Sequence, residues 1–204
     1  MDTNENTNEN TNEKQTHTKS LGALLAAAVS RAVPVVAGIE DKALDAPTPC
    51  ADYDVRALAN HLLHVVVEFQ KLAVKQDSDF SSPPDYVAEA DWRERFAREA
   101  EALVEAWSTP GAEEGTTGAL NMPARTVGGM ALLDLTAHAW DLARATGQEY
   151  GADPAVVAEL TEVVERLAPT GREMGVFGAA VPVGADADPL TRLLAATGRD
   201  PYGK

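Results

Sequence analysis

Apolar residues recur every three or four positions along most of this chain, and this helical period most constrains its fold. Residues 20–37 show it clearly, with apolar side chains at positions 21, 24, 25, 28, 29 and 32. Such spacing places those side chains on one face of a helix. No segment of useful length alternates between apolar and polar residues as a half-buried strand does. The pattern therefore predicts an all-α protein.

Start and stop signals divide this periodic pattern into separate helices. The predicted helices cover residues 20–37, 53–76, 85–108, 127–146, 154–167 and 188–197. Their candidate N-caps are Ser20, Asp52, Thr126 and Asp153, while Pro34 should kink or end the first helix and Gly147 should end the fourth. The Gly/Pro-rich connection at 108–125 is a candidate crossover. We expect an up-and-down four-helix bundle followed by extra C-terminal helices and an irregular tail.

The chain begins with a polar repeat that cannot contribute to a core. Residues 1–19 repeat the letters TNEN, which predicts a disordered tail with His17 in solvent. This start has no apolar segment of the kind a signal peptide requires. Residues 20–204 are then expected to form a single helical domain, since 204 residues, 45% of them hydrophobic, suit one core.

Charge and cysteine content narrow the partners and the compartment. The net charge of −15 disfavours binding to nucleic acid through a basic patch. The sequence contains no run of 18 apolar residues, so no membrane span is expected. The single cysteine, Cys50, excludes an internal disulfide framework. The single cysteine fits a cytoplasmic protein, while the acidity identifies no partner.

Two polar residues stand one helical turn apart in an otherwise apolar segment. The segment DLTAHAWDLARATGQ, residues 134–148, contains Asp134 and His138, which share one helix face. An unpaired carboxylate in a core is costly, so Asp134 needs a cation, hydrogen-bond donors or water. A simple Asp–His hydrogen bond or a solvated helix face would produce the same spacing.

A third candidate ligand comes from the second predicted helix. His61 has mainly apolar neighbours one turn away and is predicted to point inward, whereas His64 lies on a more polar face and is predicted either at the rim or behind the ligands. Two histidines and one carboxylate, here His61, Asp134 and His138, form a common ligand set for a catalytic divalent metal. Such a set leaves a coordination position for water or substrate.

Other polar residues have simpler interpretations. Cys50 either packs or is a reactive thiol whose pKa a helix N-terminus lowers. Asp141 and Arg144 have the spacing of a local helical ion pair. The glycines in TVGGM, residues 126–130, match no phosphate-binding loop.

Residues 45–63 and residues 134–148 resemble two signatures of the metal-binding N-terminal family of mycothiol-dependent maleylpyruvate isomerases, in the DinB-like superfamily of four-helix bundles. DAPTPCADYDVRALANHLL, residues 45–63, resembles the signature TPC-x-x-W-D-V-R-x-L-x-x-H, with Tyr53 in place of tryptophan, a change expected to affect packing alone. Residues 134–148 resemble its second signature, with Asp134 where the isomerase has glutamate. Residues 176–201 resemble the end of an actinobacterial branch of that family.

The resemblance covers residues 20–201 and implies a function for the three candidate ligands. It assigns His61, Asp134 and His138 to a divalent metal, zinc above all, and implies mycothiol as a thiol cofactor. We therefore expect an enzyme that activates a low-molecular-weight thiol for isomerisation, conjugation or transfer on a small electrophile. A thiol-independent metal hydrolase and a non-catalytic helical partner-binding or sensor module remain alternatives.

Overall fold

The computed structural model describes residues 19–203, and the predicted polar tail lies outside these residues except for Lys19. The described part is helical, as predicted, with one two-stranded sheet. Its elements are α1 (Leu21–Ala37), η1 (Asp41–Ala43), α2 (Val55–Ala73), η2 (Tyr86–Ala88), α3 (Trp92–Ser108), β1 (Thr116–Thr117), β2 (Met122–Pro123), α4 (Ala124–Thr146), α5 (Pro154–Glu173) and α6 (Pro189–Ala196). Within residues 19–203, no helix combines the length and apolarity needed to cross a bilayer.

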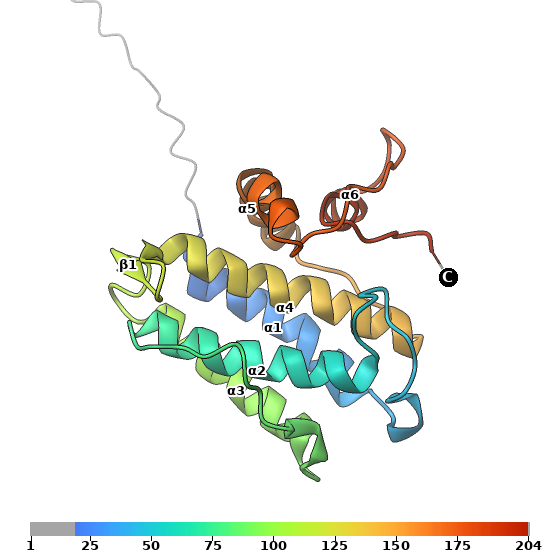
Figure 1. Cartoon of the computed structure of the whole chain (residues 1–204), viewed down its shortest axis with the longest axis horizontal. Helices are drawn as coiled ribbons and strands as arrows, with labels where there is room; N and C mark the ends of the chain where they lie inside the picture. Colours follow the sequence, from blue (N-terminus) through green and yellow to red (C-terminus); the bar gives the residue numbers. More distant parts are fainter. Residues whose placement is uncertain (1–18, 204) are drawn as a thin grey trace, which may run out of the picture.

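The first four α-helices form a bundle in which each packs against two neighbours. Helix α1 lies beside α3 and α4, and α2 lies beside the same two helices (Figure 1). Apolar side chains from all four helices form one buried core. Helices α5 and α6 lie outside this group: α5 packs against α4 and α1, and α6 packs against α5 (Figure 1). The predicted all-α bundle with C-terminal additions is confirmed.

Contacts at the helix ends show the direction in which each helix runs. The indole Nε1 of Trp107, near the end of α3, donates a hydrogen bond to the carbonyl oxygen of Phe69, near the end of α2, so these two helices run in the same direction. Residues 74–91 therefore return along the bundle and act as its crossover. The predicted crossover at 108–125 instead turns back at one end, through the antiparallel pairing of β1 with β2.

Local capping explains most helix starts and two errors of prediction. Ser20 and Asp153 cap α1 and α5 as predicted. The N-cap of α2 is Asp54 rather than Asp52, because the Asp54 carboxylate accepts a hydrogen bond from the Ala57 amide. Helix α4 begins after Pro123, two residues before the predicted cap Thr126, because the β2 strand leads directly into it.

Candidate metal centre

His61 and His138 face each other across the contact between α2 and α4. Their ring centroids lie 5.2 Å apart, and the two rings are nearly perpendicular. Tyr53 stacks on His61 with a centroid separation of 5.2 Å. The tyrosine thus contacts one of the predicted ligands. Antiparallel packing of α2 against α4 therefore brings two predicted ligands together.

Asp134 lies on the same side of α4 as His138, as its spacing predicted. Its Oδ1 is 4.0 Å from Nε2 of His138, and 35% of its side chain is exposed. Surrounding protein atoms nevertheless raise the pKa of Asp134, and only partial compensation comes from His138 and Arg199. The carboxylate is thus both accessible to a ligand and poorly stabilised as a free anion, which suits a cation-binding group.

The other ring nitrogen of His138 is held by Asp141. Nδ1 of His138 lies 3.0 Å from Oδ2 of Asp141, which is fully buried. Burial alone would raise the pKa of Asp141, but hydrogen bonds from His138 and Arg199 outweigh it and keep this pKa below the usual value. An ionised carboxylate only accepts hydrogen bonds, so Nδ1 of His138 is the donor in this contact, and in the neutral ring Nε2 is the nitrogen that offers a lone pair. Metal-binding histidines are commonly oriented in this way.

Asp141 also forms an ion pair that sequence reasoning missed. The guanidinium of Arg199 donates to both carboxylate oxygens, with Nε 3.0 Å from Oδ1 and Nη2 2.9 Å from Oδ2. The predicted pair of Asp141 with Arg144 is wrong, since Arg144 donates instead to the carbonyl oxygen of Gly203. Asp141 points inward beside His138, whereas Arg144 is directed toward the C-terminal segment. Only Asp141 could have been linked to the site from the sequence, because it lies three residues after His138 on the same helix.

The prediction that His64 lies at the rim is wrong. His64 is only 4% exposed, because residues 74–91 pass over it. Its Nε2 lies 2.8 Å from the carbonyl oxygen of Asp79, and the amide of Asp79 donates to the buried carboxylate of Glu68. His64 and Glu68 therefore fasten the crossover segment to α2, which gives His64 a structural role.

A second set of possible ligands surrounds the same histidine. Among residues 19–203, one group of three has all its ligand atoms within 4.8 Å of one another, namely Cys50, His138 and Asp141. Asp141 is already bonded to His138 and Arg199, so a metal here would have to displace Arg199. The set His61, Asp134 and His138 is wider, but within residues 19–203 its carboxylate has no such competing partner. The chemistry of the donors therefore fits a metal better on the Nε2 side of His138.

Cys50 is expected to react slowly with thiol reagents at neutral pH. Of the two interpretations of Cys50, the thiol activated by a helix N-terminus is wrong, because Cys50 lies five residues before α2 begins. Burial raises the pKa of its thiol, Asp141 adds to this effect, and Arg199 opposes it. Absorbance after addition of a chromogenic disulfide should show slower reaction in folded protein than in urea. Equal rates in both states would contradict this assignment.

Stability of the metal-free protein should fall as pH falls from about 6.5 to 4. Burial, with His138 and His64 nearby, lowers the pKa of His61 from 6.5 to about 4. The unfolded chain therefore binds more protons in this interval, and the stabilisation present above pH 6.5 is lost on acidification. Urea midpoints against pH should decline less steeply for His61→Gln. If the urea midpoints of wild type and His61→Gln declined equally with pH, protonation of His61 would not be the cause of the lost stability.

Fold and site together define a helical bundle with a histidine–carboxylate centre between two of its helices. Residues 25–143 match the family model described as the mycothiol maleylpyruvate isomerase N-terminal domain. The match spans more than half of the chain, and the chain belongs to this family.

Relatives of similar length come from Mycobacterium tuberculosis. Two uncharacterized proteins, from strains CDC 1551 / Oshkosh and ATCC 25618 / H37Rv, are each 28% identical to this chain over 174 residues. Each alignment covers 81% of this chain and 90% of the relative. No solved structure matches the chain.

Proposed function

We propose that this protein is a divalent-metal-dependent enzyme that activates a low-molecular-weight thiol, mycothiol, for reaction with a small electrophile. The observation that carries the proposal is the orientation of His138. Its Nδ1 is fixed by the buried Asp141, so its Nε2 faces the side where Asp134 and His61 lie. The family description supports the choice of thiol, since it names mycothiol.

The residues of the chain would bind and orient the metal. His61 and His138 would supply nitrogen ligands and Asp134 an oxygen, which leaves a position for the thiol. Bound zinc would lower the pKa of that thiol, so that thiolate forms near neutral pH. His61 suits this role because its lowered pKa keeps the imidazole neutral, and therefore able to bind metal, at pH 7.

Metal and thiol binding can be tested separately. Purified protein reconstituted with zinc is expected to hold about one ion per chain after gel filtration. In cobalt-substituted protein, mycothiol should produce a sulfur-to-cobalt charge-transfer band, whereas its S-methyl derivative should not. Cobalt binding without any response to mycothiol would favour the hydrolase alternative, in which metal-activated water reacts. Protein that holds no metal would favour the non-catalytic module.

A further inference from the structure

Arg199 reaches the candidate metal centre from the C-terminal segment, outside residues 25–143 that match the family model. It follows α6 and is separated by 58 positions from its partner Asp141. Its side chain is 13% exposed although it carries a permanent charge. The family match therefore does not account for this buried cation next to His138.

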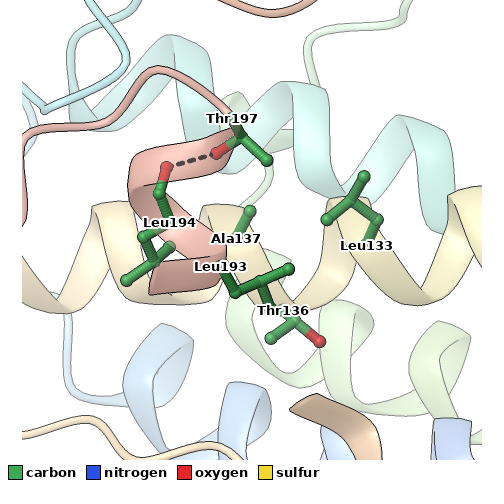
Figure 2. A pocket seen from close by; sticks show the side chains of 6 residues that line it. All are labelled: Leu133, Thr136, Ala137, Leu193, Leu194 and Thr197. Carbon is green, nitrogen blue, oxygen red and sulfur yellow. Dashed lines mark hydrogen bonds between the residues drawn. The ribbon is translucent and has the colours of Figure 1, made fainter. Parts of the chain in front are cut away.

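Helix α6 packs against α5 and faces α4, which fixes where Arg199 begins. Leu193 and Leu194 of α6 line a small apolar pocket together with Leu133 and Ala137 of α4 (Figure 2). The Thr197 hydroxyl donates to the carbonyl oxygen of Leu194, a bond that closes the end of α6 (Figure 2). The segment before Arg199 is thus placed beside α4.

A glycine turn then directs Arg199 back toward α4. Gly198 has φ of +91°, a conformation that favours glycine. A Cβ atom at this position would lie 2.5 Å from the Cα of Gly178, so the close approach of the two glycines also excludes a side chain. Arg199 can therefore leave α6 in a direction that reaches Asp141.

The guanidinium is held on two sides. Nε lies 3.0 and 3.1 Å from the two carboxylate oxygens of Asp141, and Nη2 lies 2.9 Å from Oδ2. Nη1 donates to the Thr197 hydroxyl at 3.1 Å. This geometry fixes the plane of the Asp141 carboxylate, and Oδ2 of that carboxylate is also the atom that holds Nδ1 of His138.

We propose that Arg199 is a positioning residue for the metal centre, acting through Asp141 on His138. The inference rests on the proposed function, because it concerns the metal affinity of His138. Arg199 holds the Asp141 carboxylate in the orientation that keeps Nε2 of His138 directed toward Asp134. Loss of a comparable outer hydrogen-bond partner typically weakens metal binding by about 10- to 100-fold.

A double-mutant cycle on zinc affinity tests this route of action. Zinc dissociation constants would be measured by chelator competition for wild type, Arg199→Met, Asp141→Asn and the double variant. Each single variant is expected to weaken zinc binding by about 10- to 100-fold. The double variant should lose no more affinity than the single variant that has the larger loss. Arg199→Lys, which keeps the charge without the planar fork, should show a smaller loss and serves if Arg199→Met does not fold.

Arg172→Met is the matched control, because Arg172 holds the same segment without contacting Asp141. Its guanidinium donates to the carbonyl oxygens of Ala196 and Gly178. Zinc affinity within about threefold of wild type is expected for this variant. An equal loss in Arg172→Met, or additive losses in the cycle, would overturn the positioning role while leaving the metal site intact. Wild-type protein that binds no zinc would overturn the proposed function, and this inference with it.

Discussion

His138→Asn is expected to weaken zinc binding at least about a hundredfold, more than loss of an outer hydrogen-bond partner would. Asparagine is short, and its amide nitrogen can occupy the place of Nδ1 and still donate to Asp141. It has no counterpart to Nε2, which lies 4.0 Å from Oδ1 of Asp134. The variant therefore removes one ligand atom while it preserves the buried hydrogen bond. Chelator competition measures the affinity.

His64→Gln provides the matched control on the neighbouring helix. The Gln amide nitrogen can replace Nε2 of His64 as the donor to the carbonyl oxygen of Asp79. Because that contact fastens the crossover and does not face Asp134, zinc affinity should stay within about threefold of wild type. Equal losses in His64→Gln and His138→Asn would show that binding depends on bundle stability rather than on Nε2 of His138.

The candidate ligands could be predicted from the sequence because their relation is local. Asp134 and His138 are four residues apart on one helix, so their common face follows from the helical period alone. His61 required only that α2 pack against α4. The burial of His64 could not be predicted in this way, because it depends on where residues 74–91 cross the bundle, and that path is set by packing.

Arg199 illustrates the same limit more strongly. Nothing near position 199 indicates a partner at position 141, since the contact depends on the docking of α6 and on the turn at Gly198. The interpretation of Asp141 therefore assigned it the nearest cation, Arg144. Local spacing supplied a plausible pair, whereas the tertiary structure places a different arginine in contact with the carboxylate.

Asp141→Ala is expected to lower the free energy of unfolding of the metal-free protein by about 3–5 kcal/mol. Asp141 is fully buried and accepts hydrogen bonds from His138 and Arg199. Its removal leaves the guanidinium of Arg199 in a mostly buried place without a counter-ion. Urea denaturation at pH 7 measures the loss.

Asp41→Ala is the natural comparison, because Asp41 also pairs with an arginine. The carboxylate of Asp41 lies 2.6 Å from Nη2 of Arg93, and 85% of its side chain is exposed. Water and salt screen this pair, so its loss should change the urea midpoint little. If Asp41→Ala and Asp141→Ala lowered the free energy of unfolding equally, burial would not be the reason for the loss at Asp141.

The double variant Asp141→Ala/Arg199→Met separates stability from metal binding. Removing both members of a buried ion pair leaves no uncompensated charge, so the double variant should be more stable than Asp141→Ala alone. Its zinc affinity should remain low, because no carboxylate orients His138. Recovery of stability without recovery of zinc binding would mean that the buried pair serves the metal centre. Recovery of both would mean that His138 binds zinc without Asp141 and that the pair contributes only to folding.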